Sequence, residues 1–266
     1  MTHSSVQYEQ SGPVVTLRLN RPEVRNAVNV EMVDALTRFV ERLAADESVR
    51  VVIVCGAGRG FSAGADLAQL SRAKPSEAGQ LVVRCAETMN RLASLPLPVI
   101  AAVHGFALGG GFLLSMYCDL RLVASGTKLG LPSTARVWML PWAMSRLASL
   151  VGVAKARQFV LTGGVLDADR AKSWGLVDVV VPQRDLERRA NELAADLATW
   201  PRHVMVEIRN FFCELEGLDH AYWDSLATAG FVRCFSTQEA QTAMARFRRG
   251  DRAATSLPNP TGESPS

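Results

Sequence analysis

The chain has 266 residues and a formal net charge of +3, with 29 Lys and Arg against 26 Asp and Glu. This excess is too mild for a nucleic-acid partner, and no basic run is interleaved with stacking aromatic residues. No apolar run approaches the ~20 residues of a membrane-spanning helix, and the first five residues form no export signal. We therefore expect a cytoplasmic protein with one sizeable α/β domain that binds neither nucleic acid nor membrane.

The first half of the chain alternates between two kinds of apolar periodicity. Runs rich in β-branched residues predict strands, at residues 14–19, 49–55, 99–103 and 119–124. Apolar residues at helical spacing predict helices, at residues 30–45, 77–95 and 112–117. Strands that alternate with helices favour βαβ units and a mainly parallel sheet.

From about Trp142 onward the pattern is helical. Helices are expected at residues 143–151, 154–161, 168–174, 186–200, 203–214, 222–235 and 238–248. The chain is thus expected to divide into an α/β core over residues 1–195 and a C-terminal helical region over residues 196–250. Residues 251–266 are expected to be disordered, since the end of the chain is rich in Pro, Ser and Gly.

Cysteine and lysine usage give two further expectations. The 5 cysteines are widely spaced without a C-x-x-C pair, so reduced thiols are favoured over a disulfide framework, and no metal site is expected. Lysine is rare among the basic residues and alanine is abundant, which is typical of a GC-rich bacterial genome.

Two turns of small residues each follow an expected strand and precede a helix: Phe61 to Asp66, and Gly109 to Gly111. A helix start leaves about four N–H groups unpaired and carries partial positive charge. If the turns converge, the backbone N–H groups of Ala65 and Gly110 would form an oxyanion hole, able to stabilise an enolate or a tetrahedral adduct. The simpler interpretation is that these glycines only permit tight turns.

The motifs around these turns occur in a recognisable order. They are Leu19-Asn20-Arg21-Pro22, Arg25-Asn26-Ala27, residues 61–66, residues 104–111 from His104, and Cys118-Asp119-Leu120-Arg121. With them the chain resembles the enoyl-CoA hydratase/isomerase (crotonase) superfamily over about residues 6–250. The resemblance implies a spiral of ββα repeats, followed by C-terminal helices that form a trimer interface and partly roof the neighbouring site.

The same resemblance implies a ligand. It is an acyl-CoA thioester of fatty acid/acyl-CoA metabolism, with coenzyme A as part of the substrate and no permanently bound cofactor. The resemblance also implies a homotrimer or a dimer of trimers.

Five residues correspond to the family's coenzyme A contacts. Arg25 and Ala27 lie in the loop that grips coenzyme A, where a guanidinium can pair with phosphate in a forked geometry; the alternative is a solvated arginine. Ala63, Asp66 and Leu67 resemble the adenine-binding turn. Asp66 could also cap the helix that follows it.

The chain departs from the family where a typical hydratase holds its attacking water with two glutamates. The corresponding residues are Leu113 and, directly after Pro132, Ser133. A third position, an aspartate in some isomerases and dehalogenases, falls at or next to Pro141. Leu113 cannot transfer a proton, and a lone serine such as Ser133 is a weak base, so the usual acid/base groups are missing.

Trp138 and Trp142 crowd the loop after Ser133. They either pack in a core or, with Leu113, form an apolar wall for an acyl tail. A nucleotide site at residues 56–60 is disfavoured, because Phe61 stands where the G-x-G-x-x-G pattern needs its final glycine.

Three functions remain open. The chain could be a non-catalytic acyl-CoA binding or carrier protein. It could be an acyl-CoA isomerase or decarboxylase with displaced acid/base residues. It could also hydrate enoyl-CoA, although the missing glutamates would make that reaction poor.

Overall fold

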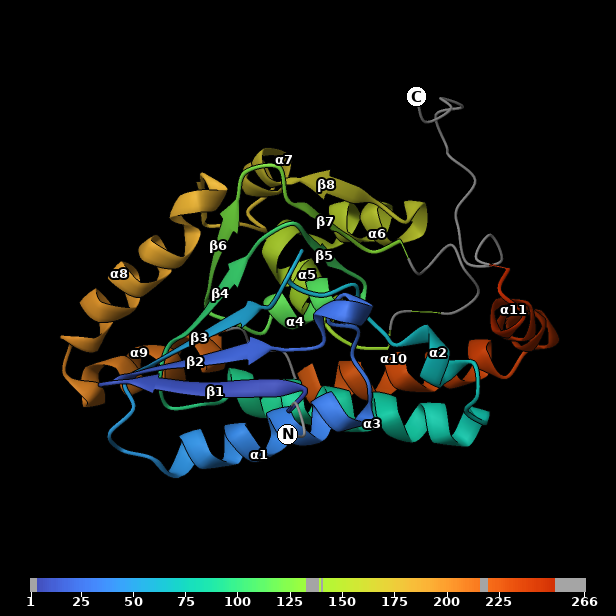
Figure 1. Cartoon of the computed structure of the whole chain (residues 1–266), viewed down its shortest axis with the longest axis horizontal. Coiled ribbons are helices and arrows are strands. Elements are labelled where there is room, and N and C mark those ends of the chain that lie inside the picture. Colours follow the sequence, from blue (N-terminus) through green and yellow to red (C-terminus); the bar gives the residue numbers. More distant parts are fainter. Residues whose placement is uncertain (1–3, 133–138, 140, 216–219, 252–266) are drawn as a thin grey trace.

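The computed structural model describes residues 4–132, 139, 141–215 and 220–251 (Figure 1). Its centre is a six-stranded sheet in the order β1-β2-β3-β4-β6-β9. These strands are β1 (Val6–Ser11), β2 (Val14–Leu19), β3 (Val51–Gly56), β4 (Val99–Val103), β6 (Leu120–Ala124) and β9 (Val179–Val181). Among the described strands of this sheet only β1 and β2 pair antiparallel, so the expected α/β class and mainly parallel sheet are confirmed.

Five of the described strands were not expected from the sequence: β1, β5 (Phe106–Leu108), β7 (Lys128–Gly130), β8 (Val165–Asp167) and β9. β1 is polar and half-exposed at the sheet edge, so it has no apolar run to reveal it. The three-residue strands β8 and β9 lie in the part expected to be purely helical. They are too short to show a period. β8 joins β5 and β7 in a second sheet, in the order β5-β7-β8.

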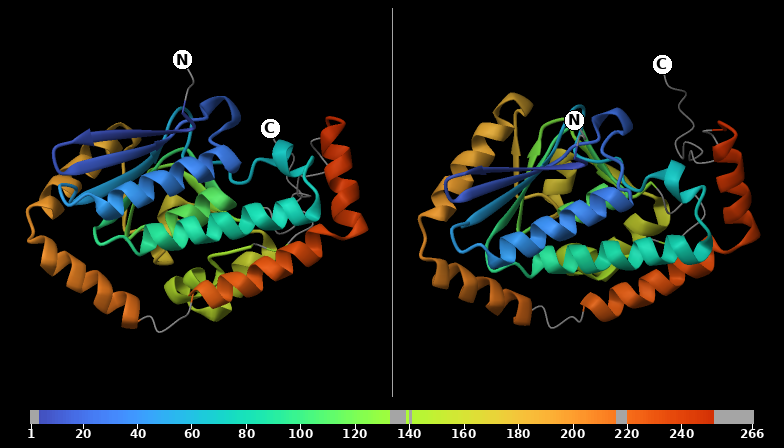
Figure 2. Two further views of the ribbon diagram at one scale, coloured as in Figure 1. Left: turned by 90° about the horizontal axis from the view of Figure 1, so that it is seen from below. Right: turned by 60° about the horizontal axis from the view of Figure 1, so that its bottom comes forward.

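Helices cover both faces of the main sheet (Figure 2). They are α1 (Val30–Ala45), α2 (Leu67–Leu70), α3 (Pro75–Ala93), α4 (Gly110–Ser115), α5 (Met144–Val151), α6 (Val153–Thr162), α7 (Ala168–Ser173), α8 (Leu186–Ala198), α9 (Arg202–Leu215), α10 (His220–Phe235) and α11 (Gln238–Arg248). α8 buries Leu186 and Ala190 against one face, where Ile53 and Ala102 lie. α1 and α3 belong to the larger core on the other face.

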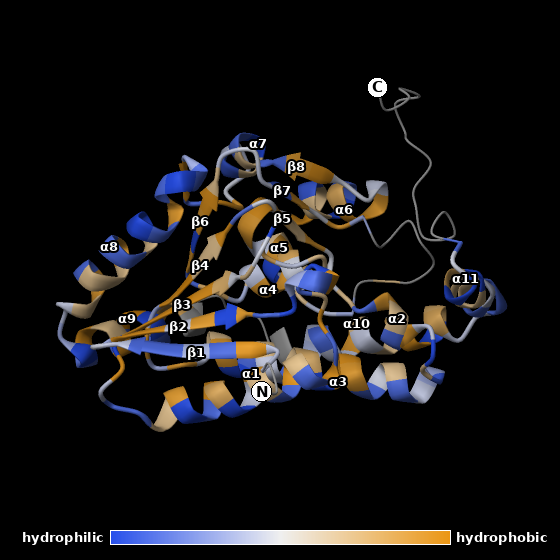
Figure 3. Ribbon diagram, in the orientation of Figure 1, coloured by the Kyte–Doolittle hydropathy of each residue, from blue (hydrophilic) through white to orange (hydrophobic). Residues whose placement is uncertain are grey.

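The polarity of each element follows this layering. Figure 3 shows apolar central strands flanked by helices with a polar outer side. β3 and β4 are buried along their whole length, as parallel strands covered on both faces must be. In the described part of the chain no helix is long and apolar enough to span a membrane.

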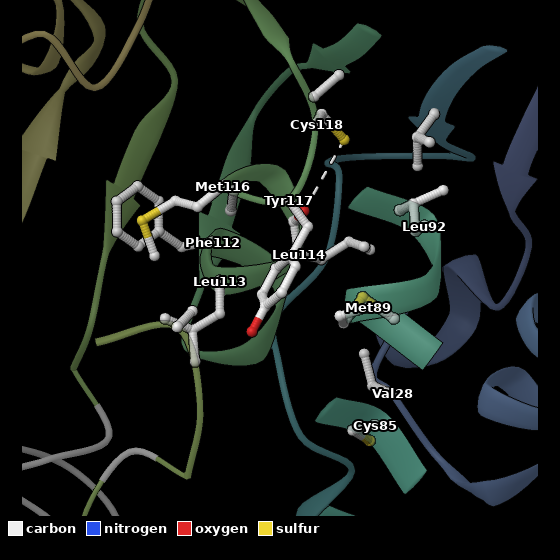
Figure 4. Packing of buried hydrophobic residues seen from close by; sticks show 14 of the residues in the cluster. Val28, Cys85, Met89, Leu92, Phe112, Leu113, Leu114, Met116, Tyr117 and Cys118 are labelled. Atoms are coloured by element: carbon white, nitrogen blue, oxygen red, sulfur yellow. Dashed lines mark hydrogen bonds between the residues drawn. The ribbon is translucent and has the colours of Figure 1, made fainter. Parts of the chain in front are cut away.

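Between α4 and α3 the core is filled by large side chains (Figure 4). Phe112 and Leu114 of α4 and Leu92 of α3 are at most 1% exposed. The buried ring of Tyr117, just after α4, lies between the two helices beside Met89. The position of α3 is therefore tied to that of the glycine turn that opens α4.

The C-terminal helix α10 packs along α3 and against α5 of its own chain (Figure 2). α10 thus covers elements of its own core. The roofing of a neighbouring subunit's site, which the family resemblance implies for the C-terminal helices, stays a prediction.

Candidate functional site

The loop after β2 is organised by the side chain of Asn26. Asn26 is fully buried and has a left-handed backbone, with φ 52°, a conformation that Asn tolerates better than most residues. Its Nδ2 donates to the carbonyl oxygens of Ala57, Gly60 and Phe61 at 2.8, 3.0 and 3.1 Å. Its Oδ1 accepts from the Arg21 N–H at 2.8 Å. Asn26 thus joins the loop after β2 to the turn after β3.

A second set of hydrogen bonds leads from Asn26 to Ala65. Ser62 Oγ donates to the Asn26 carbonyl oxygen at 2.8 Å and accepts from the Gly64 N–H at 3.1 Å. The Val28 N–H donates to the Gly64 carbonyl oxygen at 2.7 Å, and Ala65 forms a parallel bridge with Val28. The backbone before Ala65 is therefore held on both sides.

The two predicted small-residue turns touch each other. A Cβ placed on Gly64, where φ is +91°, would lie 2.6 Å from the Leu108 carbonyl oxygen and 2.9 Å from the Gly110 nitrogen. Only glycine allows this approach. The Cβ position of Gly110 is in turn 3.7 Å from the Ala65 nitrogen. Within the described residues, neither the Ala65 N–H nor the Gly110 N–H donates a hydrogen bond, so two unpaired backbone donors lie side by side.

These donors open onto an apolar cavity of about 100 Å³. Ala63, Ala65, Leu67 and Gly110 line it on the side of the two turns. The rest of the described lining includes Leu113 of α4, Trp142, and residues of α3 and α10. No lining residue within the described ranges carries a charged side chain. The cavity therefore suits an apolar group whose one polar atom faces the backbone donors.

Asp66 caps α2, as one of its two expected roles requires. Its Oδ1 accepts from the Gln69 N–H at 3.1 Å, and its Oδ2 accepts from Arg21 Nη1 at 2.9 Å. Arg25 is exposed and also has a left-handed backbone, with φ 57°, while Ala27 is buried. Arg25 thus presents a cation to solvent at the start of the loop that ends near the cavity.

A larger cavity of about 170 Å³ lies on the opposite face of the sheet, under α8. It contains Arg18, which pairs with Glu187 at 3.6 Å, and Cys55, whose pKa burial raises to about 11. Neither Ala65 nor Gly110 borders it. The smaller cavity is therefore the one next to the unpaired donors.

The model of the enoyl-CoA hydratase/isomerase family matches residues 9–249. This chain belongs to that family. A putative enoyl-CoA hydratase/isomerase of Bacillus subtilis is 39% identical over 185 residues, covering 68% of this chain and 71% of the relative. A short-chain-enoyl-CoA hydratase of Clostridium acetobutylicum is 32% identical over 256 residues, covering 93% of this chain and 95% of the relative.

Solved structures agree with this membership. An enoyl-CoA hydratase from Bacillus anthracis superposes with a TM-score of 0.78 at 29% identity, covering 95% of this chain and 98% of the other. One from Mycobacterium smegmatis gives 0.84 at 25% identity, covering 94% and 91%. The family acts on acyl-CoA substrates, which fits a cavity with an apolar wall and a polar entrance.

Of the site residues predicted from the sequence, Leu113 is 1% exposed and lines the cavity. Trp142 also lines it, and its ring lies 3.6 Å from the Cβ position of Gly110. Ser133 and Trp138 lie outside the described residues. The His104 ring nitrogen Nε2 donates to the Gly58 carbonyl oxygen at 2.9 Å, so this side chain ties the motif that begins at His104 to the turn after β3.

Asp224 of α10 was missed by the sequence analysis. It is 3% exposed, and its carboxylate accepts from the Tyr117 hydroxyl at 2.8 Å, Asn90 Nδ2 at 3.1 Å and the Ala143 N–H at 2.9 Å. Burial, and then Asp224, raise the pKa of Tyr117. The three donors lie 81 to 134 residues away in the sequence, so no local pattern could have revealed this cluster.

The cavity wall also contains Cys85, whose pKa burial raises to about 12. Cys85 is thus a neutral thiol near pH 7, and it behaves as an apolar wall residue rather than as a nucleophile. The described residues include no group of His, Cys, Asp and Glu side chains that could hold a metal ion.

Proposed function

We propose that this chain binds an acyl-CoA thioester whose carbonyl oxygen accepts hydrogen bonds from the backbone N–H groups of Ala65 and Gly110. The observation that carries the proposal is the pair of unpaired donors at the mouth of an apolar cavity. Ala65 is exposed and Gly110 is half-buried, so both N–H groups are accessible to a ligand, and a thioester oxygen with partial negative charge can accept from both. The acyl chain then occupies the cavity.

The coenzyme A part of the ligand is assigned to the neighbouring surface. The exposed Arg25 supplies a phosphate contact in the loop that also holds Ala27, while the backbone near Ala63, Asp66 and Leu67 binds the adenine. Coenzyme A arrives with the acyl group and leaves with it, so no cofactor is bound permanently.

We also propose that enoyl-CoA hydration is poor in this chain. Leu113 occupies the first glutamate position and presents only carbon to the cavity. Proton transfer by a positioned carboxylate typically contributes ~10²–10⁴-fold to rate. This absence of acid/base groups from the described wall favours an acyl-CoA binding or carrier role. The second candidate is an isomerase or decarboxylase whose acid/base residues come from elsewhere.

A homotrimer or a dimer of trimers in the cytoplasm is the assembly we propose. Large apolar side chains are 40–59% exposed on α9 and α10, which supports association through these helices: Ile208, Phe211, Phe212, Tyr222, Trp223 and Leu226. Light scattering after size-exclusion chromatography tests this, and a monomer at micromolar concentration would refute it.

Calorimetry with butyryl-CoA, free butyrate and coenzyme A tests the ligand. We expect the thioester to bind tightest, since the acyl cavity and the coenzyme A surface act together. Gly110→Pro removes the N–H at the first position of α4, where proline is tolerated. It should lower thioester affinity about tenfold, the value of one hydrogen bond of ~1.4 kcal/mol.

Gly110→Ala is the matched control for this variant. It keeps the N–H, and its added Cβ meets only ordinary contacts at 3.6–3.7 Å. Affinity equal to wild type in a folded Gly110→Pro protein would refute the oxyanion-hole assignment. No heat with any thioester at millimolar concentration would refute acyl-CoA binding itself.

A further inference from the structure

We propose that Phe231 of α10 sets the length of the acyl group, limiting it to a short uncharged chain of about four carbons. This inference rests on the acyl-CoA site proposed above and names the substrate class of that site. Phe231 is 1% exposed, lines the cavity and comes from the chain's own C-terminal helix. Its partners in this wall are Leu81, Val82 and Cys85 of α3.

The position of Phe231 is fixed by close contact between α10 and α3. A Cβ on Gly79 of α3 would lie 2.8 Å from Val232 Cγ2, so the two helices approach as closely as a glycine permits. On α10 itself, the Phe231 ring stacks on Phe235, with 5.3 Å between ring centroids and 19° between planes. The helix and the ring are therefore each held by a direct contact next to the cavity.

Three further contacts join α10 to the segment that carries Trp142. Asp224 Oδ1 accepts from the Ala143 N–H at 2.9 Å, and Thr228 Oγ1 donates to the Pro141 carbonyl oxygen at 3.1 Å. Gly230 packs so closely on Met139 that a Cβ there would collide with the sulfur. The Trp142 wall and the Phe231 wall are therefore parts of one rigid unit, and a longer acyl chain cannot separate them.

The size and polarity of the cavity give the substrate class. An apolar cavity of about 150 Å³ holds benzene, with six carbons. The cavity of about 100 Å³ therefore holds about four carbons. A carboxylated acyl group would bury its charge without a partner among the described wall residues, which favours uncharged acyl groups.

Affinities for the CoA thioesters of acetate, butyrate, hexanoate and octanoate test the proposal by calorimetry. In the wild type we expect affinity to rise about fourfold for each methylene from two to four carbons, then to level off or fall. Succinyl-CoA should bind at least tenfold more weakly than butyryl-CoA. Phe231→Ala should shift the optimum by at least two carbons and raise octanoyl-CoA affinity about tenfold or more, with butyryl-CoA changed less than threefold.

Phe159→Ala is the matched control. It removes a buried ring of the same size from α6, at a position that neither lines the cavity nor has a ring contact with Phe231. It should leave the order of chain lengths unchanged. Phe231→Leu keeps a smaller apolar side chain at position 231 and should shift the preferred acyl-chain length by a smaller amount. This variant tests the proposal if Phe231→Ala does not fold.

The outcomes distinguish the role of Phe231 from the proposed acyl-CoA binding. Butyryl-CoA binding with an unchanged length order in both Phe231 variants would overturn the role of Phe231. Equal wild-type affinity for butyryl-CoA and octanoyl-CoA would overturn the short-chain assignment. No binding of any CoA thioester to the wild type would overturn the proposed function, and the inference with it.

Discussion

Replacing Asn26 by alanine tests whether this residue holds the site together. The buried carbonyl oxygens of Gly60 and Phe61 would lose their side-chain donor, at about 1–3 kcal/mol each. The Arg21 N–H and the Ala57 carbonyl oxygen are only partly buried and can turn to water. Alanine at φ 52° adds about 1 kcal/mol. We therefore expect a loss of about 3–7 kcal/mol, a large part of the 5–15 kcal/mol typical of a domain.

The assay is urea unfolding followed by circular dichroism, with the free energy of unfolding extrapolated to water and the m-value compared. Asn20→Ala is the matched control. Asn20 Nδ2 donates at 3.2 Å to the Ser4 carbonyl oxygen at the surface, so its loss should cost about 0.5 kcal/mol or less. A cost below about 1 kcal/mol for Asn26→Ala, at an unchanged m-value, would refute the reasoning.

Three shorter predictions follow. Leu113→Glu with Ser133→Glu should raise crotonyl-CoA hydration, and wild-type turnover of ~10 s⁻¹ or more would contradict the missing-base argument. Arg25→Gly should change the free energy of unfolding by less than about 1 kcal/mol from wild type, because glycine suits φ 57°. The same variant should weaken coenzyme A binding, measured by calorimetry. An unchanged affinity would exclude a phosphate contact. Raising the pH from 8 to 10 should lower the free energy of unfolding by about 2 kcal/mol for each fully buried thiol. Burial raises the pKa values of Cys85 and Cys118 to about 12, so the folded protein keeps protons that the unfolded chain releases in this range. Cys85→Ala should remove the contribution of one thiol to this pH dependence. A wild-type free energy of unfolding that stays constant from pH 8 to 10 would contradict the prediction.

The sequence predicted the elements whose pattern is local. The expected helix over residues 30–45 is α1 (Val30–Ala45), because its buried residues keep helical spacing and Asn29 caps it, accepting from the Met32 N–H. The βαβ alternation and both small-residue turns were also visible, since each needs only a short run of residues. Family membership followed from the order of these motifs.

What the sequence could not show depends on contacts between distant segments. Asn26 was read as part of a coenzyme A loop, whereas its side chain is buried and bonds to carbonyls 31 to 35 residues away. Phe231 appeared as one of many apolar residues in a helix, and only the packing of α10 on α3 brings it to the cavity. The positions of such side chains are set by tertiary packing, which has no local signature.

The contacts of Asp224 also set an order of events during synthesis on the ribosome. Tyr117 and Ala143 precede their shared acceptor by 107 and 81 residues. At 5–20 residues per second, that delay is on the order of 5–20 s. During those seconds the nascent chain has its central strands but no α10, so the pocket lacks a wall and its apolar lining faces chaperones and proteases. Ligand cannot protect a nascent chain that still lacks α10, because the residue that closes the pocket lies on that helix.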